Sequence, residues 1–220
     1  MNTRSYAIRI IRDEAGISLI ELLVVMSLLA IVMAAVTGML ISGMTTQAKI
    51  DAQLRAQLDA RQVIYDMEKT MSEAKREDAS GNPPVFGDDM VTFPSQDGTE
   101  WYTYIYTTPP GAKSPTIVRK ITNGEPALPV TVTSSDKQMI GLGGDGLTAT
   151  VDRASDGPIF TYYGADGNQI ATDPTTHDIT DITVVRSIKV GFQTTVTEAH
   201  AKHQPVAVST QIDLRNFKVS

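Results

Sequence analysis

The stretch GISLIELLVVMSLLAIVMAAVTGMLISGM, residues 16–44, decides the fold, and it contains a single charged residue, Glu21. The residues that follow this glutamate, 22–41, carry no charge at all. As a helix of about 20 residues they extend roughly 30 Å, which is the thickness of the hydrocarbon core of a bilayer. The stretch therefore predicts a transmembrane helix that has a carboxylate near its front end.

The charges on either side of the stretch predict its orientation. Three arginines, Arg4, Arg9 and Arg12, precede it, and the next charge after it is Lys49. Positively charged residues stay preferentially on the cytoplasmic side of a membrane. We therefore expect a single crossing, with the N-terminus in the cytoplasm and the rest of the chain outside.

Two general kinds of segment fit this pattern only in part. A secretory signal peptide could use the small residues of VMAAV, 32–36, for cleavage, but its apolar region is typically about 7–15 residues long. In a plain single-pass anchor Glu21 is incidental, at a cost of about 2.5–3.5 kcal/mol at the membrane centre and less near its edge. Neither alternative gives Gly16 or Glu21 a function.

Gly16, Glu21 and the uninterrupted apolar run together resemble the class III signal of type IV prepilins and type II secretion pseudopilins. The resemblance implies a leader peptide, residues 1–16, which prepilin peptidase removes by cutting between Gly16 and Ile17. It also implies methylation of the new amine of Ile17 and places Glu21 at the fifth mature position, where the family has a glutamate. Ile17 departs from the phenylalanine that is commonest at the first mature position.

The glutamate then has a physical role in assembly. A carboxylate in hydrocarbon is costly unless it is paired, and cleavage creates a cation, the amine of Ile17, at the same depth. In a staggered bundle, Glu21 of one subunit can meet the amine of its neighbour, and a buried pair of this kind fixes register more than it adds stability. The alternative is a carboxylate that reaches the membrane edge without a partner.

The composition of the remaining chain excludes several functions. The remaining chain is long enough for one domain with its own core. The absence of cysteine excludes disulfides, thiolate zinc sites and cysteine nucleophiles. The net charge of −6 disfavours a basic surface that binds the phosphate backbone of nucleic acid. We therefore do not expect nucleic acid as a direct partner.

The helical pattern continues beyond the membrane segment. No proline occurs before Pro83, so we expect one helix over residues 17–77. Its first part, 17–44, lies in the membrane or filament core, and its second part, 45–78, is amphipathic and packs on a head. The apolar positions of this second part are Ile50, Leu54, Leu58, Ile64, Met67 and Met71. A dimeric coiled coil through these positions is the alternative.

Residues 79–220 are expected to form a β-rich globular head, so the fold class is α+β. Gly81 and two prolines break the helix. We expect the head to contain one or two antiparallel sheets that pack against the amphipathic helix. Strands are expected within 100–108, 116–122, 129–134, 147–151 and 159–170, with a turn at 165–168, and 181–196 and 205–217 should form a closing hairpin.

One strand places three aromatic residues on a single face. In EWYTYIYTT, Tyr102, Tyr104 and Tyr106 alternate with Trp101 and other residues. We expect this face to pack within the fold, and a platform for a sugar or another ligand is the alternative.

Two motifs that could carry chemistry have simpler explanations. GLGGDG, 141–146, fits the dinucleotide pattern G-x-G-x-x-G, but a strand-like segment follows it where that site needs a helix, so we expect a turn. His200 and His203 could share one helix face, but a third ligand is missing nearby, and His177 lies elsewhere. We expect a solvated loop there.

Two acidic pairs, Asp88 with Asp89 and Asp166 near Asp173, are the remaining candidates. Some minor pseudopilins bind calcium in acidic, glycine-rich loops, but neither pair lies in a recognisable calcium loop of about 12 residues. We expect no catalytic, cofactor-binding or metal-binding residue and no enzymatic activity, with structural calcium as the alternative.

The C-terminal part adds a weaker resemblance. This part is similar to the corresponding part of larger minor pilins and J-class minor pseudopilins. The features that carry the similarity are a strand with a DG turn, the apolar pattern around IKVGF and the ending Leu214-Arg215-Asn216. The resemblance implies a minor structural subunit in the tip or initiation complex of a type IV pilus or type II secretion pseudopilus. Its partners are then prepilin peptidase, other pilin or pseudopilin subunits and an assembly platform in the inner membrane. The protein first lies in that membrane and then in a periplasmic or surface filament. A major pilin of the shaft and a plain membrane-anchored surface binding protein are the alternatives.

Cleavage can be tested by mass spectrometry of the mature protein. We expect the chain to begin at Ile17, with a methylated amine where the second reaction also occurs. Gly16→Ala should be processed poorly and bulkier substitutions not at all, because the peptidase must approach the backbone closely at this position. A mature chain that starts after Ala35, or still at Met1 in cells with active peptidase, contradicts the prediction.

Overall fold

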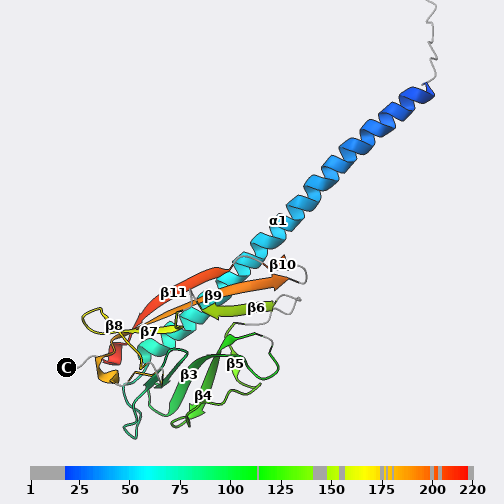
Figure 1. Cartoon of the computed structure of the whole chain (residues 1–220). Coiled ribbons are helices and arrows are strands. Elements are labelled where there is room, and N and C mark those ends of the chain that lie inside the picture. The colour runs from blue at the N-terminus through cyan, green and yellow to red at the C-terminus, as the bar shows by residue number, and fades with distance from the viewer. Residues whose placement is uncertain are drawn as a thin grey trace, which may run out of the picture. The chain divides into compact units, whose positions relative to one another are not determined.

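The computed structural model confirms an α+β fold in which a long N-terminal helix is followed by antiparallel sheets (Figure 1). It describes residues 18–112, 114–140, 148–153, 157–173, 176, 178–179, 181–198, 201–202 and 205–217. The chain forms two compact units, Met1–Ala48 and Lys49–Ser220. The helix α1, Leu19–Glu73, contributes to both.

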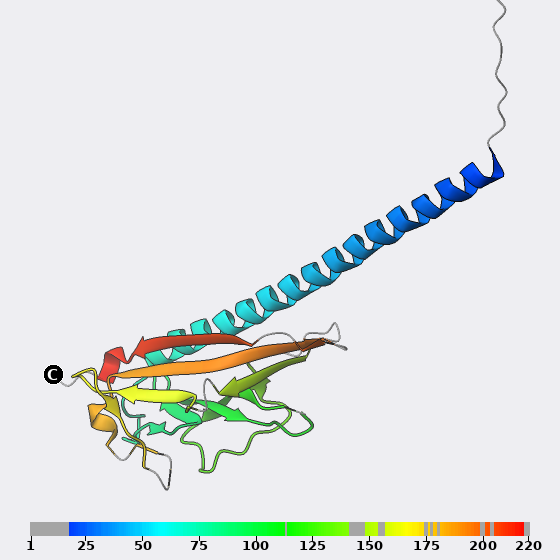
Figure 2. The same ribbon diagram turned by 45° about the horizontal axis from the view of Figure 1, so that its top comes forward.

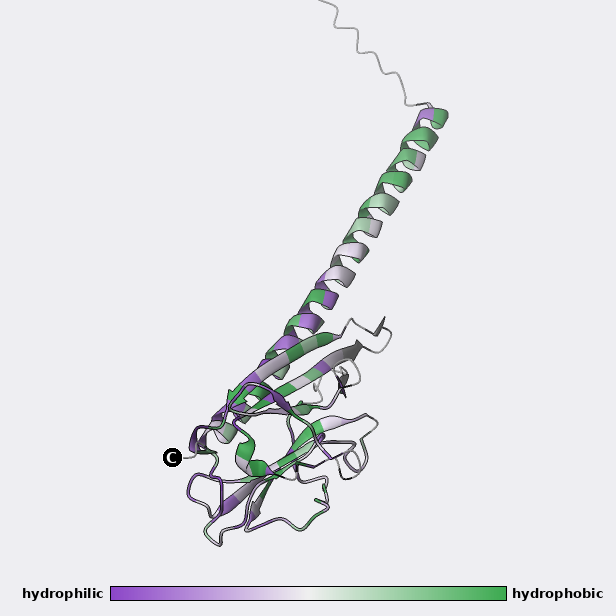
Figure 3. Cartoon of the chain, turned by 60° about the vertical axis from the view of Figure 1, so that its left-hand side comes forward, coloured by the Kyte–Doolittle hydropathy of each residue, from purple (hydrophilic) through white to green (hydrophobic). Residues whose placement is uncertain are grey.

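In the first unit, α1 exposes its side chains throughout. It begins after Ser18, whose carbonyl oxygen accepts a hydrogen bond from the Leu22 N–H at 3.1 Å. Every side chain from residue 18 to residue 47 is exposed, and the hydropathy colouring of this part of α1 is predominantly apolar (Figure 3). Within the described residues, α1 is long and apolar enough to cross a membrane by length and composition.

In the second unit, the first part of α1 buries alanines, and the large side chains that the sequence pattern favoured are buried only further along the helix. Of the six apolar positions expected to face the head, Met67 and Met71 are buried and Ile64 is half-buried. The other three were predicted wrongly, because Ile50, Leu54 and Leu58 are 49%, 51% and 63% exposed. The buried side chains of this helix are Ala52, Ala56, Ala60, Val63, Met67 and Met71.

These alanines form the buried face of this part of α1, and a search for large apolar residues overlooks them. The helix ends at Glu73, earlier than the expected residue 77. After it, the Lys75 N–H donates to the carbonyl oxygen of Pro94 at 3.3 Å, so the chain has already left the helix to join the first sheet.

The first sheet has the order β1-β2-β3-β4-β5, and all its pairings are antiparallel. Its strands are β1 (Val85–Phe86), β2 (Met90–Pro94), β3 (Glu100–Thr107), β4 (Thr116–Asn123) and β5 (Lys137–Gln138). The strands expected at 100–108 and 116–122 are confirmed as β3 and β4. The short β1 and β5 and the strand β2 were not among the expected strands.

The strand expected at 129–134 is wrong, because this segment is a loop. Its backbone bonds to side chains instead of to a neighbouring strand. The Lys120 ammonium donates to the carbonyl oxygen of Thr131 at 2.5 Å, and a carboxylate oxygen of Asp136 accepts from the Thr133 N–H at 2.6 Å. Local bonds of this kind compete with the ladder of a sheet.

The second sheet is built around the long strand β9 (Ser187–Glu198) (Figure 2). On one side, β9 pairs with β6 and β7, and β8 lies beyond β7; on the other side, β9 pairs with β10 and β11. These strands are β6 (Thr148–Arg153), β7 (Phe160–Tyr163), β8 (Gln169–Ile170), β10 (Ala201–Lys202) and β11 (Val206–Asp213). Two short 3₁₀ helices, η2 (Ile182–Val184) and η3 (Arg215–Phe217), precede β9 and follow β11.

The pairing of β9 with β11 confirms the expected closing hairpin. The expected turn at 165–168 connects β7 to β8 and is also confirmed. It requires a glycine at Gly167, whose φ of 76° lies in the left-handed region. The turn was expected from its turn residues, and the hairpin from two β-rich stretches that a polar segment separates.

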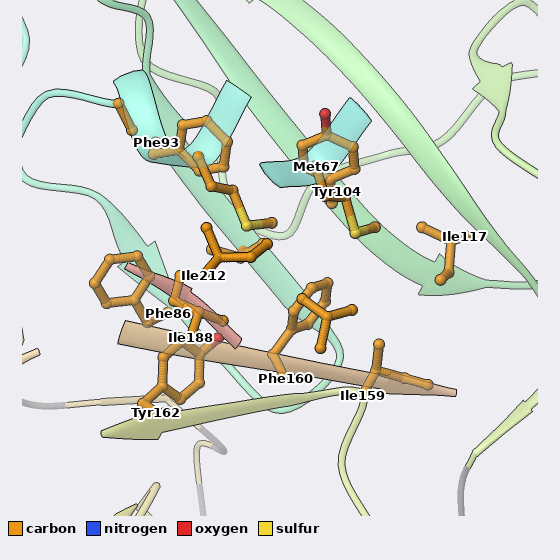
Figure 4. Packing of buried hydrophobic residues seen from close by; sticks show 14 of the residues in the cluster. Met67, Phe86, Phe93, Tyr104, Ile117, Ile159, Phe160, Tyr162, Ile188 and Ile212 are labelled. Atoms are coloured by element: carbon orange, nitrogen blue, oxygen red, sulfur yellow. The ribbon is translucent and has the colours of Figure 1, made fainter. Parts of the chain in front are cut away.

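The core of the second unit lies where α1 and the two sheets meet (Figure 4). Met67 comes from α1, Tyr104 from the first sheet, and Phe160 and Tyr162 from the second; all four are fully buried. Tyr104 stacks on Phe93 with 6.1 Å between ring centroids. The tyrosine face of β3 therefore packs within the fold, as expected, with Tyr102 and Tyr106 half-buried against the same core.

A polar cluster ties α1 to the first sheet. One guanidinium nitrogen of Arg119 donates to both carboxylate oxygens of Asp66, at 2.9 and 2.6 Å. The Tyr104 hydroxyl lies 3.0 Å from the same carboxylate and 2.7 Å from the hydroxyl of Thr70. Burial raises the pKa of Tyr104, so this hydroxyl stays protonated and donates.

The C-terminus of α1 is completed by a residue of η3. The side-chain amide of Asn216 donates to the carbonyl oxygens of Glu73 and Ala74, at 3.1 and 3.2 Å. The last carbonyls of a helix have no partner within the helix, and this amide supplies one. The neighbouring Arg186 donates to the carbonyl oxygen of Phe217 at 2.6 Å, which holds η3 in place.

The alanine face of α1 can be tested with two substitutions on the same turn of helix. Ala60→Leu should destabilise a fragment of residues 49–220 by about 1–3 kcal/mol, because Ala60 is fully buried and larger side chains overpack such a site. Leu58→Ala, on the exposed side, should change the free energy of unfolding by no more than about 0.5 kcal/mol. Urea unfolding measures both, and the opposite ranking would restore the apolar stripe predicted from the sequence.

Candidate processing and assembly segment

The predicted cleavage site lies outside the described residues. The leader, 1–16, and the bond between Gly16 and Ile17 precede Ser18, the first residue that the structure describes. Cleavage at this bond and methylation of Ile17 therefore stay predictions. The structure begins at the residues that follow them.

Glu21 lies in the first turn of α1. The N-terminus of a helix carries a partial positive charge, which favours a carboxylate in the first turn. Glu21 is also the one charged residue between Leu19 and Ala48. The segment thus places a single negative charge at the start of a long apolar helix.

Three hydroxyl groups along this helix bond to its own backbone. Ser27 donates to the carbonyl oxygen of Val24 at 2.8 Å, and Thr45 and Thr46 both donate to that of Ser42, at 2.9 and 2.8 Å. Such bonds allow hydroxyl side chains to enter hydrocarbon at little cost. A carboxylate cannot be satisfied in this way, so Glu21 is the side chain of this segment whose burial requires a cation.

Several other candidates lie outside the described residues. These are the glycine-rich segment 141–146 and the three histidines, His177, His200 and His203. The expectation of a turn in the first case and of a solvated loop in the second is therefore untested.

The acidic candidates interact with protein groups. Asp89 forms an ion pair with Arg153, and Asp88 accepts a hydrogen bond from the Thr172 hydroxyl at 2.9 Å. Asp166 accepts from the backbone N–H of Asn168 at 3.0 Å, which lowers the pKa of this carboxyl. In the part of the chain that the structure describes, no group of three or more histidine, aspartate or glutamate residues is placed to hold a metal ion.

Comparison with known proteins identifies the N-terminal segment. Residues 11–37 match the family model of the prokaryotic N-terminal methylation motif. The comparisons with curated proteins and with solved structures gave no match. The matched residues include Gly16, Ile17 and Glu21.

The motif, the apolar helix and the β-rich head together define a membrane-anchored protein of the pilin type. The chain is a type IV prepilin- or pseudopilin-like protein. Its N-terminal motif marks it for processing by prepilin peptidase and for assembly with other pilin-like subunits.

The role of Glu21 can be tested by substitution. Glu21→Ala should leave membrane insertion and cleavage intact, because removing a charge eases insertion. It should impair assembly, because the amine of a neighbouring Ile17 loses its counter-charge, at a cost of about 3–5 kcal/mol for a broken buried pair. Glu21→Gln keeps the shape but not the charge and should also be defective. Incorporation into sheared filaments measures the effect.

Ser27→Ala is the matched control on the same helix, since it removes only a bond within the helix. It should be incorporated as well as the wild type. Wild-type incorporation of Glu21→Ala would show that the carboxylate has no part in assembly.

Proposed function

We propose that the chain is a minor subunit of a type IV pilus or type II secretion pseudopilus, in the tip or initiation complex that primes filament assembly. One observation carries the proposal: the methylation motif opens a helix whose side chains from 18 to 47 are all exposed. A surface that is this apolar needs hydrocarbon before assembly and other apolar helices after it. A filament core supplies the second environment.

The proposed course begins in the inner membrane. The N-terminus lies in the cytoplasm and the head outside, as the arginines before the apolar stretch favour. Prepilin peptidase cuts between Gly16 and Ile17, and the new amine pairs with Glu21 of an adjoining subunit. The subunit then leaves the bilayer through an assembly platform and enters a periplasmic or surface filament.

The proposed role is structural and involves no catalysis, cofactor or direct contact with nucleic acid. Proteins that carry this motif are typically structural. The head supports this role because its tyrosine face and its polar cluster are used for packing α1 on the sheets.

Two features favour a minor subunit over a major one. The ending Leu214-Arg215-Asn216 is similar to that of J-class minor pseudopilins, and here Leu214 is buried and Asn216 binds the end of α1. The second unit, Lys49–Ser220, is also large beside the heads that major pilins usually carry. Both features support the proposal of a subunit that is needed in few copies.

Counting subunits in sheared filaments tests the proposed role. We expect the chain in far fewer copies than the main subunit, and its deletion should reduce the number of filaments, because an initiation complex acts once per filament. Quantitative mass spectrometry and electron microscopy give the two readouts. A chain that forms the bulk of the filament would be a major pilin. A function that persists when prepilin peptidase is blocked would indicate a plain anchored binding protein.

A further inference from the structure

One asparagine of the sequence is followed by a glycine. The asparagines are Asn2, Asn82, Asn123, Asn168 and Asn216. Of these, Asn123 precedes Gly124, whereas Asn82 precedes a proline, which has no backbone N–H to lose. The backbone nitrogen of the next residue can attack the side-chain amide of an asparagine, and a glycine, which has no Cβ, hinders this approach least. Asn123 is therefore the asparagine of this sequence that is chemically most able to lose its amide.

This asparagine lies at the open end of a strand pair. It is the last residue of β4 and lies opposite Glu100, the first residue of β3. The chain connects the two strands at their other end (Figure 1). The φ of Gly124 is 87°, in the left-handed region, so the backbone requires a glycine there. The glycine is thus fixed by the turn that ends β4.

The side chain of Asn123 is not held. It is exposed, and among the described residues its amide has no hydrogen-bond partner. By contrast, the amide of Asn168 donates to the carboxylate of Asp166 at 2.7 Å, and that of Asn216 donates to the carbonyl oxygen of Glu73 at 3.1 Å. The amide of Asn123 can therefore turn toward its own backbone.

The attacking nitrogen is also held weakly. The Gly124 N–H donates to the carbonyl oxygen of Thr99 at 3.4 Å, whereas such bonds usually measure about 2.9–3.0 Å. The extended backbone at Asn123 must rotate before the two groups can react. This rotation breaks one long bond at the end of a ladder, where local opening costs little free energy.

We propose that Asn123 is a site of spontaneous deamidation in the folded protein. The nitrogen of Gly124 gives up its proton and attacks the side-chain carbonyl carbon of Asn123, which closes a succinimide ring, and the amide nitrogen takes up a proton and leaves as ammonia. Water then opens the ring. Breaking the bond to the side-chain carbonyl carbon leaves aspartate, and breaking the bond to the backbone carbonyl carbon leaves isoaspartate. The inference goes beyond the proposed function and does not depend on it.

The product places a new negative charge opposite Glu100. The backbone of Glu100 bonds to Ser95, because the Glu100 N–H donates to the Ser95 hydroxyl at 3.1 Å and the Ser95 N–H to the Glu100 carbonyl oxygen at 2.8 Å. Glu100 and Asn123 are therefore a pair without mutual backbone bonds, the kind whose side chains lie closer together. Like charges directly opposite each other destabilise a strand pair. Deamidation thus makes this end of the first sheet more acidic and less stable.

Peptide mass spectrometry of the full chain tests the site. The chain is kept folded in detergent at neutral pH, and samples taken over time are digested with trypsin. The tryptic peptide 121–137 contains Asn123 as its one asparagine. We expect this peptide to lose its amide progressively, with isoaspartate detected by an isoaspartyl methyltransferase. Asn168, whose amide is held by Asp166, is the internal control and should keep its amide over the same period.

Substitutions test the consequence for the first sheet. Asn123→Asp reproduces one product and should lower the Tm, whereas Asn123→Gln should keep the wild-type Tm because the amide has no partner to lose. Adding Glu100→Gln to Asn123→Asp should restore the Tm, since it removes the opposing charge. Glu100→Gln in the wild-type chain is the matched control.

Two results overturn the modification site. One is loss of the amide at equal rates from Asn123 and Asn168, and the other is loss from Asn123 only after urea has unfolded the chain, which would show that the fold protects it. A wild-type Tm for Asn123→Asp, or no recovery with Glu100→Gln, overturns the repulsion by Glu100.

Discussion

The close contact between α1 and the two sheets is the interaction on which the second unit depends. The helix offers alanines where it meets β11 and larger side chains where the core widens: Ala52 and Ala56 pack near Val206, and Met67 and Met71 lie in the main cluster. Neither sheet has a complete core without the helix, because the inner faces of both pack on the same side of it. A segment that also carries the membrane anchor is thereby the central element of the head.

The sequence predicted the parts of the fold that depend on local patterns. Strict alternation identified β3, and turn glycines identified the β7–β8 connection. Predictions from local pattern were wrong where contacts between residues far apart in the sequence determine the structure. Ile50, Leu54 and Leu58 have the spacing of a buried stripe, yet the buried face of this part of the helix is the opposite one, which alanines occupy. The loop at 129–134 resembles a strand until Lys120 and Asp136 bind its backbone.

The same distinction applies to the candidate site. The motif around Gly16 and Glu21 is a local signal, which a short stretch of sequence contains in full, and the family model matches it. The polar cluster of Asp66, Arg119 and Tyr104 was not found in the sequence, because its members come from α1, β4 and β3 and meet only in the folded chain.

The hydrogen bonds between Asn216 and the end of α1 join residues 143 and 142 positions apart. A ribosome makes α1 well before Asn216, so the helix is ready for the membrane long before its far end can be completed. The anchor and the head are therefore finished at different times, and a truncated product keeps the membrane-seeking helix while it lacks the residues that close the fold. Completion of the last turn of α1 thus follows the synthesis of both sheets.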